Sequence, residues 1–322
     1  MLALATLTTG WVVDWSTVGP AQPPRCSAPP HGPSSGQVYT LKVDSPDGPQ
    51  DRCFATRHVA KLPPGPRPVL LYHHGAGGNA NDCGKDGAVM TGEPLGAAVS
   101  RHGFILVCTE AVQYAPHSSS WPLPGMGGGL WHLQDNVTNA TGNRCSEPYG
   151  PTPPGYDLRD IDYVHAVVAM LKQEPERYDM TRLFVHGCSM GACFSSYSAQ
   201  CLHETEGASL TAWSVTGSGL KSYGDGTELP GSPAQHPGEF FPFFPGAEAA
   251  SPPLKACVFD NLDDQIGIAK GIPETSRELN RTWIERGNRA ALTMHPTGGH
   301  CGIHDWEEVF ECLDDGTGRL LG

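Results

Sequence analysis

The segment VHGCSMGACF, at residues 185–194, places Ser189 in the pattern glycine, any residue, serine, any residue, glycine. A serine in this pattern lies on a sharp turn between a strand and a helix, where its hydroxyl is exposed. The apolar run RLFV precedes the pattern, and an alanine-containing helical stretch follows it. The context predicts that Ser189 is the nucleophile of a hydrolase. A tight strand-to-helix turn that merely requires small residues is the alternative interpretation.

A serine hydroxyl is a weak nucleophile, so it needs a histidine base and a carboxylate that orients the histidine. In strand–turn–helix hydrolases these residues follow one another along the chain in the order serine, acid, histidine. His300 lies in the glycine loop TGGHCG, between the last expected strand and the last expected helix. We therefore expect His300 to be the base. His304 is the alternative, better suited to a supporting or capping role, and His295 is expected to be structural.

The acid should follow the apolar strand ACVF, and three aspartates do so. Asp263 is favoured because it lies four residues beyond Phe259, the last apolar residue of the strand. Asp264 and Asp260 remain alternatives.

Acyl transfer also needs two backbone N–H groups that stabilise the developing oxyanion. Met190, directly after the nucleophile, is expected to supply one. Ala76, in the early glycine loop HHGAGGNA, is expected to supply the other. The loop lacks the lysine and spacing of a phosphate-binding loop. No partner with metal-ligand spacing accompanies His73 and His74, so no metal site is predicted.

One cysteine, Cys188, precedes the expected nucleophile, and another, Cys301, follows the expected base. If Ser189 and His300 meet, their neighbouring cysteines come near the separation that a disulfide requires. Such a bridge would hold the base loop against the nucleophile turn. Two unrelated buried cysteines are the alternative.

Short apolar runs alternate with helical patterns from about residue 37 onward. This alternation predicts an α/β fold with a mainly parallel central sheet and helices on both faces. The expected strands are 67–75, 103–111, 182–187, 209–217, 255–261 and 291–296, and the expected helices are 157–174, 192–202, 275–287 and 305–313. Residues 1–36 read as a leader and irregular arm, and residues 37–322 as a single catalytic domain. The long glycine- and proline-rich stretches 114–156 and 217–253 are expected to line a binding cleft.

Composition favours an exported protein. Eleven cysteines indicate an oxidising compartment, and the N-terminal MLALATLTTGWVV is similar to the apolar part of a secretory signal. Three glycosylation sequons begin at Asn136, Asn139 and Asn280. Cys26 with Cys53, or Cys193 with Cys201, are further candidate disulfides. A net charge of −13 argues against nucleic acid or an anionic membrane as partner, and no apolar run is long enough to span a membrane.

The ordered segments HHGAGGNA, GCSMGA, DNLDDQI and GGHCG resemble α/β-hydrolase esterases of the polyhydroxybutyrate depolymerase and feruloyl (acetylxylan) esterase group, over about residues 66–310. GMGGGLWHLQDN is similar to the tryptophan-bearing substrate loop of that group, which implies that Trp131 contacts the acyl chain or polymer. His74 is expected to contact substrate beside it. The Cys-Ser and His-Cys pairs resemble the tannase and fungal feruloyl esterase pattern, in which these cysteines are bridged. The acid loop departs from the group, with FD in place of histidine-glycine.

Together these features predict a secreted, cofactor-free serine esterase with the fold of the α/β-hydrolases. Its expected partner is an ester substrate, aromatic (feruloyl-type) or short hydroxyacyl and polyester-like. A serine peptidase of the same fold and a non-catalytic binding protein on that fold remain the alternatives. The sequence does not indicate an oligomeric state.

Overall fold

A computed structural model describes residues 21–22, 24, 26, 34–43, 49–59, 64–81, 83–84, 87–114, 128–131, 160–217, 253–268, 272–285 and 287–314 of the 322-residue chain. Most of the stretches 114–156 and 217–253 lies outside these residues, so their place beside a cleft stays a prediction. The sequons at Asn136 and Asn139 also lie outside them. Asn280 lies on a helix, with its amide oxygen buried.

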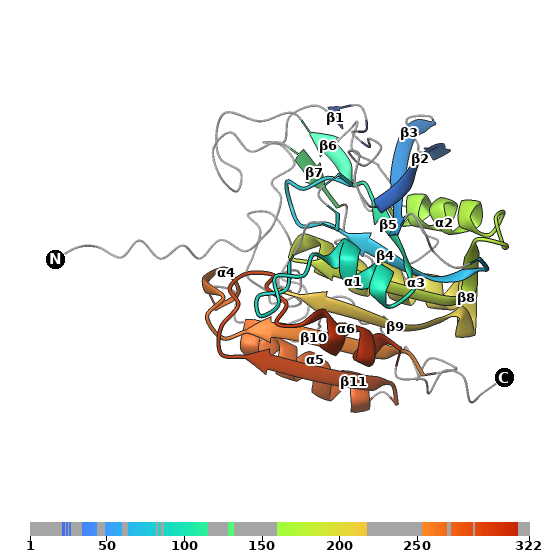
Figure 1. The fold of residues 1–322 in the computed structure, drawn as a ribbon. Helices are drawn as coiled ribbons and strands as arrows, with labels where there is room; N and C mark the ends of the chain where they lie inside the picture. The colour runs from blue at the N-terminus through green and yellow to red at the C-terminus, as the bar shows by residue number, and fades with distance from the viewer. Residues whose placement is uncertain are drawn as a thin grey trace, which may run out of the picture.

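The centre of the fold is an eight-stranded sheet with the order β11-β10-β9-β8-β4-β5-β3-β2 (Figure 1). Its six strands from β11 to β5 run parallel, whereas β3 pairs antiparallel with β5 and β2 antiparallel with β3. The strands are β2 (Ser34–Val43), β3 (Gln50–Val59), β4 (Arg67–His73), β5 (Ile105–Thr109), β8 (Tyr178–Cys188), β9 (Leu210–Thr216), β10 (Lys255–Asn261) and β11 (Arg289–His295). The predicted mainly parallel sheet is confirmed.

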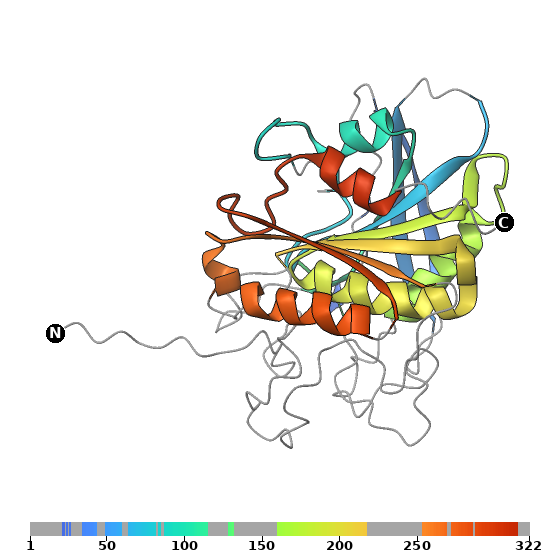
Figure 2. The ribbon, with the colours of Figure 1, turned by 90° about the horizontal axis from the view of Figure 1, so that it is seen from below.

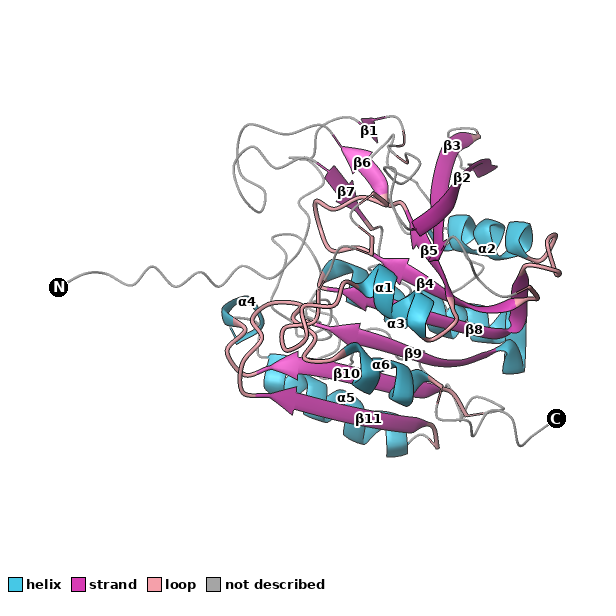
Figure 3. Ribbon diagram, in the orientation of Figure 1, coloured by secondary structure: helices cyan, strands magenta, loops and turns pink. Residues whose placement is uncertain are grey.

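Helices cover both faces of this sheet (Figures 2 and 3). On one face lie α1 (Leu95–Arg101) and α6 (Trp306–Leu313), and on the other α2 (Asp160–Leu171), α3 (Met190–Glu206) and α5 (Ile272–Glu285). Two separate clusters of buried apolar side chains correspond to these two layers. Every residue of β5 is buried because both of its faces are covered, which explains its unbroken apolar sequence. The short helix α4 (Gln265–Ile268) follows β10, and the 3-10 turn η2 (Gly207–Ser209) follows α3.

The N-terminal part holds structure that the sequence did not reveal. β2 begins at Ser34, inside the arm expected to be irregular. A small sheet joins β1 (Ala21–Gln22), β6 (Val112–Tyr114) and β7 (Gly128–Leu130). A disulfide between Cys26 and Cys53, with 6.0 Å between the Cα atoms, ties the arm to β3. The candidate disulfide Cys26–Cys53 is therefore confirmed. The candidate disulfide Cys193–Cys201 is wrong, because the two cysteines lie eight residues apart on α3, about 12 Å along its axis.

Two further disulfides, Cys83–Cys108 and Cys257–Cys312, cross-link the described residues. Disulfides of this kind are typical of proteins from oxidising compartments. Within the described part of the chain, no helix is both long enough and apolar enough to cross a membrane.

Two histidines are buried within the strands. His73 contacts Thr109 Oγ1 through Nδ1 at 2.7 Å and Ser198 Oγ through Nε2 at 3.0 Å. Burial, with a smaller contribution from His74, lowers the pKa of His73 to about 3. Burial likewise lowers the pKa of His186 to about 4, and its Nδ1 lies 2.7 Å from Ser214 Oγ. Both imidazoles are therefore neutral in the folded protein at pH 7.

We expect the free energy of unfolding to fall as the pH is lowered from 6.5 toward 4. The unfolded chain binds protons on these histidines below about pH 6.5, whereas the folded protein does not. The stabilisation is thus complete above that pH, and about 2 kcal/mol per histidine is lost at pH 5. Urea unfolding at pH 7, 6 and 5 measures the effect. His186→Asn, which keeps a polar group near Ser214, should show a pH dependence shallower by about one proton. An equal slope in variant and wild type would contradict this assignment.

Candidate active site

Ser189 lies at the junction of β8 and α3, at the carboxyl edge of the parallel strands. Its backbone is left-handed, with φ 56° and ψ −123°. Among the described residues only Ser189 and Cys301 have a positive φ without being glycine. Such a conformation costs on the order of 1–3 kcal/mol and persists where the surrounding structure enforces it. The geometry is that of the strand–turn–helix element expected for an exposed nucleophile.

The two glycines of the motif allow close backbone approach. A Cβ atom at Gly191 would collide with the carbonyl oxygens of His73 and His74 at the end of β4. A Cβ at Gly187 would collide with Ser195 Oγ and the Gly191 carbonyl. Small residues at these positions therefore let the first turn of α3 pack directly on the loop after β4.

His300 lies in the loop between β11 and α6, and its Nδ1 is 2.8 Å from Asp264 Oδ2. Because a carboxylate only accepts hydrogen bonds, this contact assigns the proton to Nδ1 and leaves Nε2 as the basic nitrogen. Nε2 is buried and has no hydrogen-bond partner among the described residues. The imidazole is thus oriented as a general base requires.

The preference for Asp263 as the partner of His300 is wrong. Asp263 is exposed, and its Oδ1 accepts a hydrogen bond of 2.8 Å from the Gly299 amide. Asp264, after the turn that follows β10, is 2% exposed and faces His300. Asp260 is still within β10 and accepts a hydrogen bond from Ser276 Oγ on α5, away from His300. The two aspartates are adjacent in the turn, and only the carboxylate of Asp264 points toward His300.

Asn261, which the sequence interpretation overlooked, holds the base loop. Its Nδ2 donates to the carbonyls of Gly299 at 2.9 Å and of Gly302 at 2.8 Å. The only signal in the sequence is the polar end of a buried strand, and such an end is common. Asn261 therefore holds the carbonyl groups of the loop that carries His300, and Asp263 holds the Gly299 amide of the same loop.

The other two histidines of this region support the loop. His295 ends β11, and its Nε2 lies 2.9 Å from Glu308 Oε2. His304 stacks on His295 at 3.7 Å and contacts the Thr297 carbonyl through Nε2. The capping role considered for His304 belongs to Asp305, whose side chain accepts from the Glu307 amide.

The expected bridge between Cys188 and Cys301 is present, with 5.5 Å between the Cα atoms. It joins the residue before Ser189 to the residue after His300, across 113 residues of sequence. The Ser189 amide donates to Thr216 O at 3.1 Å. A Cβ at the next residue, Gly217, would lie 3.1 Å from His300 Nδ1. The nucleophile turn and the base loop therefore lie against the same end of β9.

We expect the double variant Cys188→Ala/Cys301→Ala to lose both stability and ester hydrolysis. The chain-entropy relation gives about 4–5 kcal/mol for a loop of this length, and the base loop also loses its covalent link to the nucleophile turn. Urea unfolding and kcat/KM for an ester measure the two losses.

The matched control for this variant is Cys257→Ala/Cys312→Ala. It opens a loop of 55 residues between β10 and α6, so its expected loss of stability is similar. Its kcat/KM should stay within about threefold of wild type at a temperature where both proteins are folded. Equal losses of activity in the two double variants would show that the Cys188–Cys301 bridge serves stability alone.

The glycine loop after β4 passes directly beside Ser189. A Cβ at Gly75 would lie 3.4 Å from Ser189 Cβ and 3.5 Å from Cys188 O. The Gly78 amide donates to Gly75 O at 3.1 Å, closing a turn with Gly77 at φ 78°. Ala76 lies within this turn.

Met190 is the first residue of α3, so its amide has no acceptor within the helix. Both amides expected to form the oxyanion hole thus belong to segments adjoining Ser189.

The expectation that Trp131 and His74 contact substrate is not supported. Trp131 is fully buried, stacks on Phe194 at 4.5 Å and donates from Nε1 to His74 O at 2.7 Å. His74 is 3% exposed; its Nδ1 contacts Gly75 O at 2.8 Å, and its Nε2 accepts from the Ala111 amide at 3.2 Å. Both side chains therefore support the glycine loop.

In the described part of the chain, no group of three or more histidine, cysteine, aspartate or glutamate side chains could hold a metal ion.

No family model matches the sequence, and no curated protein is significantly similar to it. Solved structures do match. An S-formylglutathione hydrolase from Agrobacterium tumefaciens is similar with a TM-score of 0.51 and 15% identity, over 92% of this chain and 99% of that one. An esterase from Pyrobaculum calidifontis matches with a TM-score of 0.45 and 13% identity, over 87% of this chain and 81% of that one. An esterase from Rhizomucor miehei gives 0.47 and 13%, over 91% and 84%.

At 15% identity, the similarity to the S-formylglutathione hydrolase shows the fold alone. The chain has the α/β-hydrolase fold, as the sequence predicted. Within that fold, Ser189 occupies the turn after β8, and the loop that carries His300 is covalently tied to it.

Proposed function

We propose that this protein is a secreted, cofactor-free serine carboxylic-ester hydrolase. The observation that carries the proposal is the turn at Ser189, which has a positive φ and is cross-linked by Cys188–Cys301 to the loop of His300. The Nδ1 atom of that histidine faces the buried carboxylate of Asp264. A tight turn that needs only small residues would not require this arrangement around it.

In the proposed reaction, Ser189 Oγ attacks the ester carbonyl carbon while its proton passes to His300 Nε2. The carbonyl oxygen becomes an oxyanion and accepts hydrogen bonds from the amides of Met190 and Ala76. When the intermediate collapses, the alcohol leaves with the proton from His300, and an acyl-serine remains. Water then attacks the acyl group and gives its proton to His300, and the second collapse returns that proton to Ser189. Asp264 stabilises the imidazolium in both halves.

For the substrate we propose aromatic esters of the feruloyl type or short hydroxyacyl esters, including polyesters built from them. This assignment rests on the resemblance of the segments around the loop after β4, Ser189, the acid loop and His300 to feruloyl esterases and polyhydroxybutyrate depolymerases. The burial of Trp131 removes one support for it. Secretion is supported by the disulfides.

The test is to treat the folded protein with a fluorophosphonate probe and map the labelled peptide by mass spectrometry without reduction. We expect one label, on Ser189, in a peptide linked through Cys188 to Cys301. Steady-state assays should show faster hydrolysis of p-nitrophenyl acetate and methyl ferulate than of a peptide p-nitroanilide. Absence of label on folded protein would overturn the esterase proposal in favour of a binding protein, and faster anilide cleavage would replace it with a peptidase.

A further inference from the structure

We propose that Glu110 is a positioning residue for the oxyanion hole, acting through the loop that carries Ala76. The inference rests on the proposed function. We name the segment His74–Ala80 the oxyanion loop. Glu110 is the residue directly after β5, and β5 is the strand next to β4 in the sheet.

The oxyanion loop needs external support because of its composition. Three of the four residues in its turn, Gly75–Ala76–Gly77–Gly78, are glycines, which restrict the backbone least of all residues. Oxyanion stabilisation requires a donor within about 3 Å of the reacting oxygen, and a displacement of about 1 Å can cost about 10²-fold in rate. The rigidity must therefore come from neighbouring segments.

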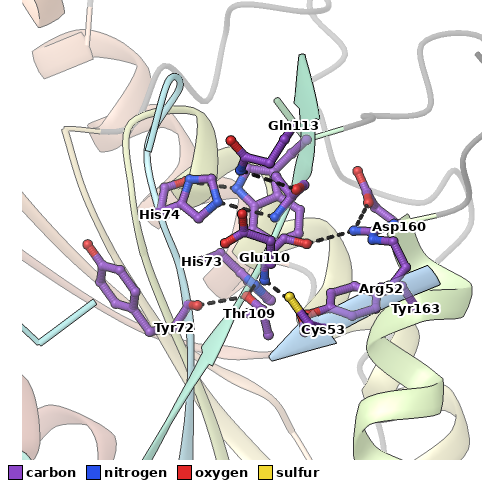
Figure 4. A network of polar contacts seen from close by, with 12 residues as sticks. Arg52, Cys53, Tyr72, His73, His74, Thr109, Glu110, Gln113, Asp160 and Tyr163 are labelled. Atoms are coloured by element: carbon purple, nitrogen blue, oxygen red, sulfur yellow. Dashed lines mark hydrogen bonds and ion pairs between the residues drawn. The ribbon is translucent and has the colours of Figure 1, made fainter. Parts of the chain in front are cut away.

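Residues 110–113 supply that support at three points (Figure 4). The Ala111 amide donates to His74 Nε2 at 3.2 Å, where the loop begins. Gln113 Nε2 donates to Gly78 O at 3.3 Å, at the end of the turn. The Glu110 carboxylate accepts a hydrogen bond from the Ala80 amide, at the far end of the loop. Both ends of the loop and the end of its turn are thus held by one short segment.

The supporting segment is itself anchored in the core. Arg52 Nη2 donates to Glu110 O at 2.7 Å and to Asp160 Oδ1 at 2.6 Å. The Glu110 amide donates to the Tyr163 hydroxyl at 2.9 Å, and the Arg52 guanidinium lies 4.0 Å from the centroid of the Tyr163 ring. Glu110 is only 1% exposed, Arg52 4%, and Asp160 and Tyr163 are fully buried. Figure 4 shows these side chains converging on Glu110 from β3 and α2.

Burying the Glu110 carboxylate costs several kcal/mol of desolvation. The carboxylate is, however, a stronger acceptor than a neutral group, by roughly twofold for a charge-assisted hydrogen bond. Since the Ala80 amide closes the oxyanion loop, the strength of this bond bears directly on how firmly Ala76 is held. We therefore assign the Glu110 carboxylate to loop positioning rather than to proton transfer.

The test compares Glu110→Gln with wild type on p-nitrophenyl acetate and on the corresponding thionoester, in which sulfur replaces the carbonyl oxygen. A well-placed oxyanion hole favours the oxygen ester, since a thiolate-like centre is larger and a weaker acceptor. We expect kcat for the ester to fall about 10–100-fold with KM little changed, and the ester-to-thionoester rate ratio to shrink at least fivefold. A merely structural role would not move that ratio.

Tyr178→Phe is the matched control. Tyr178 is the first residue of β8, at the end of the strand opposite Ser189, and is 1% exposed. Its hydroxyl lies 2.9 Å from the hydroxyl of Tyr39. This variant loses a buried hydrogen bond and should lose stability while keeping the wild-type ratio. If Glu110→Gln fails to fold, Glu110→Asp keeps the charge but shortens the side chain by one methylene and so withdraws the carboxylate from the Ala80 amide, and the same shrinkage is expected.

The outcomes separate this inference from the proposed function. If wild type hydrolyses the ester and the foldable variant keeps its ester-to-thionoester ratio within twofold, the positioning role is overturned and the esterase remains. If folded wild type hydrolyses neither ester nor thionoester and Ser189 takes no probe, the proposed function fails and the positioning role fails with it.

Discussion

The Ser189→Ala variant is expected to lower kcat for ester hydrolysis by about 10⁶-fold, the loss typical of removing a triad nucleophile. The hydroxyl forms the covalent bond to the acyl group, so no other side chain of the turn can substitute for it. KM should change little, since binding of the ground-state ester does not require the hydroxyl. The measurement is steady-state hydrolysis of p-nitrophenyl acetate, together with the burst of p-nitrophenol that acylation releases.

Ser196→Ala is the control for the loss of a serine hydroxyl from the same segment of the chain. Ser196 is fully buried on α3, seven residues after Ser189. It should retain activity within about threefold of wild type. Residual turnover by Ser189→Ala above about 1% would mean that another residue attacks the ester, and would remove Ser189 from the mechanism.

The second large effect distinguishes two adjacent aspartates. Asp264→Asn should lower kcat about 10⁴-fold, because an amide facing His300 Nδ1 stabilises the wrong tautomer and cannot stabilise the imidazolium. Asp263→Asn should cost less than about tenfold. Its Oδ1 accepts a hydrogen bond from the Gly299 amide, and an asparagine oxygen at the same place can also accept.

Because the two residues are neighbours, each variant is the control for the other. Both should be compared at the same pH by kcat/KM, with circular dichroism to show that each is folded. The opposite order of effects would restore Asp263 as the acid and would require the turn after β10 to differ from the one described here.

The features predicted well were those with local causes. The glycine–serine–glycine turn, the apolar strands and the glycine loop around His300 each follow from short-range sterics or from burial on both faces of a sheet. The link between Cys188 and Cys301 was predictable for a related reason. Each cysteine adjoins a residue whose place is set by the expected chemistry, so bringing Ser189 and His300 together brings the thiols together as well.

What the sequence by itself determined about this protein is therefore its fold class, its candidate nucleophile and base, and the bridge between them. Only the tertiary structure decided which side chains face the site. Asp263 and Asp264 differ by one step around a turn, which points one into solvent and the other at His300. Trp131 and His74 are turned inward to support the oxyanion loop. The Glu110 carboxylate accepts a hydrogen bond from the amide of Ala80, which lies 30 residues earlier in the sequence. Such directions depend on packing between distant segments, which no local pattern records.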